Sequence, residues 1–347
     1  MINRRTLLQF FAVVVGIAAA NPVWAASGNK LQVVATFSIL GDMVSRIGGE
    51  YIELKTLVGR NGDAHVFQPV PADAAAVREA DVLIVNGLGF EGWLDRLVEA
   101  SGFQGTPVVA TAGIDLISLE GGHDGHDEHA DEKGPADHNE KGHHNDDDHH
   151  KDGDQHVGKD KHDEHADHHD HGAFDPHAWQ SLANAVIYAD NIAAALSKAD
   201  PARATSYYQN RAAFVAEIRA VDAEVRETVA ALPESARTIV TSHDAFGYFA
   251  EAYGLTFVAP QGMSTESEAS AADVAALIRQ IRKEKIKAVF VENIGNSRLL
   301  EQIAKETGAT IGGSLYSDAL SDIDEAAPTY LEMMRHNLRT LASALAS

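Results

Sequence analysis

The chain has 347 residues, enough for two domains of ordinary size, and 45% of its residues are apolar. Its formal net charge of −23 argues against nucleic acid or an anionic membrane as a partner and suits a cationic ligand better. The sequence contains no cysteine, which excludes disulfide bonds, thiolate metal ligands and lipid attachment through a cysteine.

Residues 1–26 have the pattern of an export signal peptide. Arg4 and Arg5 supply the charged start, residues 7–20 the apolar core, and residues 23–25 a small-residue cleavage site. The apolar core is short for a membrane-spanning helix. The paired arginines resemble a twin-arginine signal only loosely, so the export route stays open. We therefore expect a periplasmic protein that is exported, soluble and not lipidated.

Apolar runs alternate with helical patterns in both halves of the chain. Strands are expected at residues 31–37, 51–58, 81–86, 107–110, 238–241, 255–258, 288–292 and 310–314. Helices are expected at residues 39–47, 72–79, 93–100, 182–197, 245–253, 270–284, 297–307 and 326–345. This alternation predicts an α/β fold of two lobes, each a mostly parallel sheet flanked by helices.

Residues 203–232 predict one long helix that joins the two lobes. They contain neither proline nor glycine, and Phe214, Ile218, Val221, Val225 and Val229 form one apolar stripe. Such a helix would span about 45 Å at about 1.5 Å per residue, more than the width of a small domain. The predicted domains are therefore a signal peptide (1–26), an N-terminal lobe (27–200), a linking helix (201–232) and a C-terminal lobe (233–347).

A polar insert occupies residues 121–172 of the N-terminal lobe. It holds 14 of the 18 histidines, with 17 acidic residues against 5 lysines. So little apolar surface predicts a solvated, disordered segment. An acidic linker is the alternative, but imidazole and carboxylate are ligands for Zn²⁺ and similar ions. We expect weak accessory metal sites at His123, His126, His129, His143, His144, His149, His150, His165, His168, His169 and His171.

Four histidines lie outside the insert. His65 and His243 each follow a predicted strand, one in each lobe, and His177 precedes a helix. Ligands of open α/β sheets bind beyond the carboxyl ends of the strands, so these three imidazoles could converge between the lobes. His336, in the last helix, is expected at the surface. A fourth ligand must be an oxygen donor because cysteine is absent.

Several carboxylates could supply that oxygen. Asp318 follows the last predicted strand, and Asp322 and Asp324 come shortly after it. Glu292 ends another predicted strand and is either a rival ligand or an outer partner of a ligating histidine. Position alone leaves these alternatives open.

Three motifs resemble those of the substrate-binding proteins of bacterial zinc and manganese ABC transporters, specifically the ZnuA-type zinc members. They are Asp63-Ala64-His65-Val66-Phe67-Gln68-Pro69, Asp175-Pro176-His177-Ala178-Trp179 and Ser242-His243-Asp244-Ala245-Phe246-Gly247-Tyr248-Phe249. A histidine-rich insert before the second motif is typical of the zinc members. The resemblance covers nearly the whole mature chain and implies two lobes, a rigid linking helix and one metal buried between the lobes.

The resemblance implies that His65, His177, His243 and Asp318 are the metal ligands. The chain departs from the family pattern at Ala64 and Ala319, where proline is usual. Three imidazoles and one carboxylate suit tetrahedral Zn²⁺, whereas manganese sites favour oxygen donors. The manganese branch of the family has glutamate at the position of His243.

The sequence therefore predicts a monomeric periplasmic receptor, not an enzyme, that delivers Zn²⁺ to a membrane ABC permease. A periplasmic metallochaperone is a further expected partner. The alternatives are a zinc buffer or chaperone acting through the insert, a manganese receptor, and a zinc hydrolase with Glu292 as its base.

Overall fold

The structure, a computed structural model, describes residues 30–119 and 173–345. The predicted signal peptide and the histidine-rich insert, with its eleven candidate accessory ligands, lie outside the described residues. Within the described part of the chain, no helix combines the length and apolar character needed to cross a membrane.

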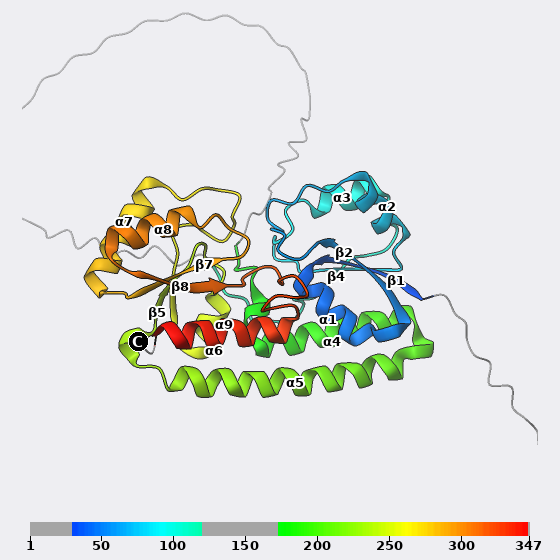
Figure 1. The fold of residues 1–347 in the computed structure, drawn as a ribbon. Coiled ribbons are helices and arrows are strands. Elements are labelled where there is room, and N and C mark those ends of the chain that lie inside the picture. Colours follow the sequence, from blue (N-terminus) through cyan, green and yellow to red (C-terminus); the bar gives the residue numbers. More distant parts are fainter. Residues whose placement is uncertain (1–29, 120–172, 346–347) are drawn as a thin grey trace, which may run out of the picture.

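The N-terminal lobe is built on a parallel sheet of four strands. The strands are β1 (Leu31–Phe37), β2 (Ile52–Val58), β3 (Val82–Val85) and β4 (Val108–Val109), in the order β2-β1-β3-β4. Helices α1 (Ser38–Gly48) and α4 (Leu182–Ala199) lie on one face, and α2 (Pro71–Glu79) and α3 (Leu94–Ser101) on the other (Figure 1). Because helices cover both faces, the inner strand β3 is entirely apolar and buried, whereas the edge strand β2 alternates buried residues with exposed ones such as Glu53.

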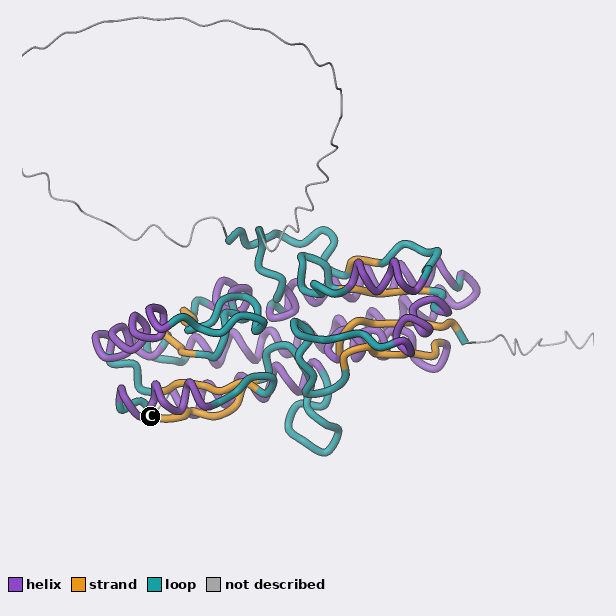
Figure 2. Tube along the Cα trace, turned by 90° about the horizontal axis from the view of Figure 1, so that it is seen from above, coloured by secondary structure: helices purple, strands orange, loops and turns teal. Residues whose placement is uncertain are grey.

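The C-terminal lobe repeats this arrangement. Its strands are β5 (Thr238–Val240), β6 (Thr256–Val258), β7 (Ala288–Glu292) and β8 (Thr310–Leu315), all parallel, in the order β6-β5-β7-β8. Helices α7 (Ala271–Glu284) and α8 (Arg298–Thr307) lie on one face, and α6 (Gly247–Tyr253) and α9 (Tyr330–Leu345) on the other. Seen from above, the two groups of strands are separate (Figure 2). The predicted two-lobe α/β fold is confirmed.

Helix α5 (Ala204–Ala230) runs beneath both lobes in Figure 1. Its buried stripe includes the five predicted apolar residues and packs against α1 and α4 in one lobe and α6 and α9 in the other. Ion pairs attach it on both sides, Arg46 to Glu217 at 2.9 Å and Arg335 to Glu224 at 2.8 Å. At about 1.5 Å per residue, its 27 residues span about 40 Å.

The lobes share one apolar core through these helices. Buried residues of β1, α4, α5 and α9 belong to a single cluster, in which the rings of Phe37 and Trp179 are 4.9 Å apart. A smaller cluster lies under α7 and α8. We retain the division at residues 27–200, 201–232 and 233–347 as a proposal, supported by the confinement of each sheet to one lobe.

The last helix begins later than predicted, at Tyr330 rather than Ala326. Pro328 disfavours helical backbone at the residue before it, and the Thr329 hydroxyl accepts a hydrogen bond from the Glu332 N–H at 3.3 Å, as a capping residue does. The prediction of a surface His336 was wrong. His336 is half-buried, its Nε2 lies 3.0 Å from the Ser314 carbonyl, and its ring packs on Tyr316.

Candidate metal site

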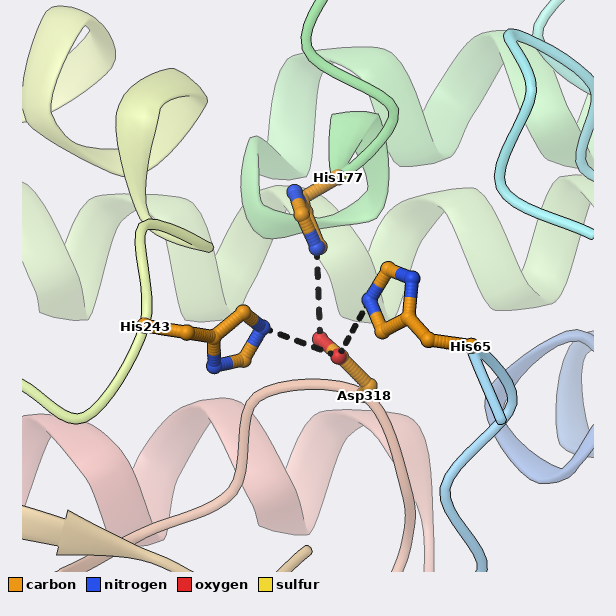
Figure 3. Close-up of side chains that lie close together, drawn as sticks. All are labelled: His65, His177, His243 and Asp318. Atoms are coloured by element: carbon orange, nitrogen blue, oxygen red, sulfur yellow. Dashed lines mark hydrogen bonds and ion pairs between the residues drawn. The ribbon is translucent and has the colours of Figure 1, made fainter. Parts of the chain in front are cut away.

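Four side chains that are distant in sequence meet between the lobes (Figure 3). His65 lies in the loop after β2 and His243 three residues after β5, so each stands beyond the carboxyl end of a parallel strand. His177 immediately precedes a short 3₁₀ turn, Ala178–Gln180, which leads into α4. Asp318 lies in the loop between β8 and α9. One potential ligand atom from each residue lies within 4.8 Å of all the others.

The Asp318 carboxylate is the centre of this cluster. Its Oδ2 lies 3.2 Å from His65 Nε2 and 3.1 Å from His243 Nε2. Its Oδ1 lies 3.8 Å from His177 Nε2. All three imidazoles therefore present the same ring nitrogen to one carboxylate, an arrangement a single cation could occupy.

The cluster is almost sealed from solvent. His177 and Asp318 have no exposed surface, and the side chain of His65 is 4% exposed. Asp318 Oδ1 and His177 Nε2 have no hydrogen-bond partner among the described residues. Because buried polar atoms are normally paired, these two inward-facing atoms fit a site made for a metal ion.

The charges in the site depend strongly on one another. Burial favours the neutral imidazole of His243, yet the negative charges of Glu292 and Asp318 raise the pKa of His243 well above its ordinary value. Burial would raise the pKa of Asp318, but the adjacent His243 and His177 hold that pKa well below its ordinary value. Asp318 is therefore ionised, and the site attracts positive charge.

Carboxylates behind two of the imidazoles orient the rings. Asp175 Oδ1 lies 2.8 Å from His177 Nδ1, and Glu292 Oε2 lies 2.6 Å from His243 Nδ1. A carboxylate only accepts, so in the neutral imidazole that can bind a metal Nδ1 carries the proton and Nε2 offers its lone pair to the centre of the site. Of the sequence alternatives for Glu292, the geometry favours the outer partner of His243.

An aspartate two residues before a histidine supports the backbone at two of the candidate ligands. Asp63 Oδ1 accepts the backbone N–H of His65, and Asp175 Oδ1 that of His177, each at 2.9 Å. Both aspartates belong to the sequence motifs given above, but the sequence alone indicated no role for them. The shared Asp-x-His spacing in the two motifs was the signal that could have identified them.

The loop that carries Asp318 is bonded to the N-terminal lobe on both sides of that residue. The Ser317 carbonyl accepts from Trp179 Nε1 at 2.9 Å and from Gln180 Nε2 at 2.7 Å. The Leu320 carbonyl accepts the Asn61 N–H at 2.8 Å. Ala64 and Ala319, where the family pattern has proline, are fully buried. These contacts hold Asp318 in place without that proline.

The rival aspartates of the same loop do not face the site. Asp322 and Asp324 are exposed, whereas Asp318 is enclosed. The described residues on either side of the histidine-rich insert are paired with each other: Ser118 and Phe174 form an antiparallel bridge, and the Leu119 N–H bonds the Ala173 carbonyl at 2.9 Å. This paired segment comes directly before the motif that contains His177.

The chain is similar to known metal-binding proteins over nearly its full length. Residues 33–344 match the family described as ZnuA, zinc-uptake complex component A, periplasmic. The manganese ABC transporter substrate-binding lipoprotein PsaA of Streptococcus mitis is 30% identical over 97% of this chain and 96% of its own length. The iron-binding protein YfeA of Yersinia pestis is 30% identical over 97% of this chain and 93% of its own length.

A solved structure has the same fold. The periplasmic zinc-binding protein TroA of Treponema pallidum superposes with a TM-score of 0.74 at 27% identity, covering 92% of this chain and all of that one. The similar proteins are thus named for manganese, iron and zinc.

Proposed function

The chain belongs to the ZnuA family of periplasmic components of metal-uptake complexes, and from that premise we propose that it is a zinc receptor. As a member, it is a metal-binding substrate-binding protein of an ABC transporter, not an enzyme, and works with a membrane permease. The finer proposal is that it binds Zn²⁺ through His65, His177, His243 and Asp318 and delivers it for import.

The donor set carries the proposal of zinc. Three Nε2 atoms and a carboxylate converge within 4.8 Å of one another, and cysteine is absent. Tetrahedral Zn²⁺ accepts such a set readily, whereas manganese favours more oxygen donors. Relatives named for manganese and iron make those ions the competing cargo. Copper and nickel would also bind in vitro, so affinity alone does not identify the physiological ion.

A growth experiment distinguishes these cargoes. A strain lacking this protein should fail to grow under chelator-imposed zinc limitation, and added Zn²⁺ should restore growth while Mn²⁺ and Fe²⁺ should not. Plasmid-borne wild-type protein should restore growth, and the His177→Ala variant should not. Growth restored by manganese or iron alone would show that this ion, and not zinc, is the cargo.

We propose an accessory role for the insert, which would raise the local supply of zinc or accept it from a metallochaperone. The alternative, a buffer that works mainly through the insert, predicts several weak sites and no tight one without it. In a variant without residues 122–172, Glu120 and Gly121 would connect Leu119 to Ala173. Leu119 and Ala173 are already paired by a hydrogen bond, and a two-residue loop is a common connection between antiparallel segments. One tight site in calorimetry of this variant, absent after His177→Ala, supports the receptor; loss of tight binding on deletion favours the buffer.

The hydrolase alternative is excluded by the family, whose members are transport receptors. The proposed base, Glu292, is also engaged: its Oε1 accepts the backbone N–H groups of Ser242 and His243 at 2.7 and 3.0 Å, and its Oε2 faces His243.

The protein acts outside the cytoplasm, as its family does. Some relatives are named lipoproteins, whereas this sequence has no cysteine for lipid attachment. We therefore propose a periplasmic monomer without a lipid anchor, released after cleavage of residues 1–26. Size-exclusion chromatography with light scattering and mass spectrometry of the purified protein test these points.

A further inference from the structure

A short segment of the C-terminal lobe crosses to the N-terminal lobe beside the metal site. We name residues 261–265, which follow β6, the strap. At one end the strap is tied to the loop that carries a candidate ligand, because Gln261 bridges to His243 and the Asp244 N–H bonds the Gly262 carbonyl at 3.2 Å. At the other end the Thr265 hydroxyl donates to Asp63 Oδ2 at 2.6 Å.

Asp63 shares its two oxygens between the lobes. Oδ2 accepts from Thr265, while Oδ1 accepts the backbone N–H of His65 at 2.9 Å. Bonded contacts therefore run from His243 through the strap and Asp63 to His65 without passing through the metal position. Opening of the lobes would break the Thr265–Asp63 bond and free the carboxylate that supports His65.

We propose that Thr265 is a positioning residue whose hydroxyl latches the lobes in the metal-bound state and slows release of the ion. This inference rests on the proposed receptor function. A hydroxyl bonded to a carboxylate forms a charge-assisted hydrogen bond, stronger than a neutral one. Asn293 Nδ2 also reaches across to Asn61 Oδ1, at 3.1 Å, but both groups are neutral and this contact is exposed. The Thr265 bond is partly buried and directly linked to a candidate ligand.

The test compares Thr265→Val, which keeps the side-chain shape but removes the hydroxyl, with Thr265→Ser, which keeps the hydroxyl. Full-length wild type and both variants are loaded with one equivalent of Zn²⁺, and release to excess chelator is followed by stopped flow. Association is measured separately. Thr265→Val should release zinc about tenfold faster with unchanged association, as expected for loss of one hydrogen bond to a charged group. Thr265→Ser should stay within about twofold of wild type.

An Asp63→Asn variant provides a second measurement. Asparagine still accepts from the His65 N–H but replaces the charged oxygen that faces Thr265, so release should be intermediate. The double variant should release zinc about as fast as Thr265→Val alone, not at the product of the two effects, because the two residues share one interaction.

The outcomes are distinguishable. Wild-type release rates in Thr265→Val, or equally fast release in Thr265→Val and Thr265→Ser, would overturn the latch and leave the receptor function intact. Additive effects in the double variant would overturn it as well. If wild-type protein holds no zinc tightly, the proposed function fails and the latch fails with it.

Discussion

Nδ1 of His243 lies 2.6 Å from Oε2 of Glu292, and both side chains are almost completely buried. The same carboxylate also accepts the backbone N–H groups of Ser242 and His243. Glu292 therefore sets both the backbone and the ring orientation of His243, and in the neutral imidazole it holds the ring proton on the nitrogen that faces away from the metal position.

Replacement of Glu292 by glutamine should weaken zinc binding by about tenfold to a hundredfold, the usual effect of removing an outer carboxylate. The glutamine amide would donate to Nδ1 and shift the ring proton to Nε2, where it blocks coordination. Competition titration against a zinc chelator measures the change. Glu268→Gln, on an exposed loop, is the matched control and should bind as wild type does. Wild-type affinity in Glu292→Gln would show that Glu292 does not position the ligand.

Replacement of Asp318 by asparagine should weaken zinc binding by more than about a hundredfold, beyond the effect of an outer partner, because it removes the carboxylate that faces all three imidazoles. The variant should still fold, since asparagine has nearly the same shape. Asp322→Asn changes an exposed carboxylate of the same loop and should leave affinity unchanged. If Asp322→Asn were the damaging change, the loop would have to be arranged differently around the ion.

Zinc affinity should fall with decreasing pH from above 6.5, the ordinary pKa of histidine, because the pKa of His243 is raised in the metal-free protein. An imidazolium cannot coordinate, so zinc must displace that proton below the raised pKa. Titrations in buffers of different ionisation enthalpy would measure the protons released. Affinity independent of pH across this range would argue against a protonated His243.

The stability of the metal-free protein should show the opposite pH dependence. His243, with its raised pKa, stabilises the fold fully below its ordinary 6.5 and loses this contribution as pH rises through the raised value. Asp318, with its lowered pKa, contributes above its ordinary 3.8 and loses its contribution only as pH falls through the lowered value. The melting temperature of the metal-free protein should therefore decline as the pH rises above 6.5. The increase in melting temperature on addition of zinc should become larger as the pH rises. The decline should be absent in His243→Gln.

Deletion of residues 122–172 should slow zinc loading from dilute solution, or from a metallochaperone, without weakening the tight site. The described residues that form the cluster lie outside this segment, whereas the segment holds 14 imidazoles that capture ions weakly. Stopped-flow loading and growth under zinc limitation measure the effect. A variant in which all 14 histidines are serine but the length is retained separates ligand chemistry from linker length. Unchanged loading and growth in both variants would remove the accessory role.

Local sequence patterns were sufficient to predict most of the fold. The spacing of apolar residues along the sequence identified the strands of both sheets. The apolar stripe from Phe214 to Val229 predicted the helix that joins the lobes. Helix ends were less well predicted. Near Tyr330 the boundary depends on Pro328, the Thr329 cap and a hydrogen bond from the Tyr330 N–H to Asp42 in the other lobe. That last partner lies 288 residues away in the sequence.

The sequence alone determined the donor types available to a metal, because it contains no cysteine and has histidines beside strand ends. It could not decide among Asp318, Asp322 and Glu292, which are chemically almost equivalent as isolated residues. Only the tertiary structure enclosed Asp318 among three imidazoles, turned Glu292 toward the back of His243 and left Asp322 exposed. The physical reason is that a carboxylate's role depends on its burial and neighbouring charges, which the packing of the two lobes creates.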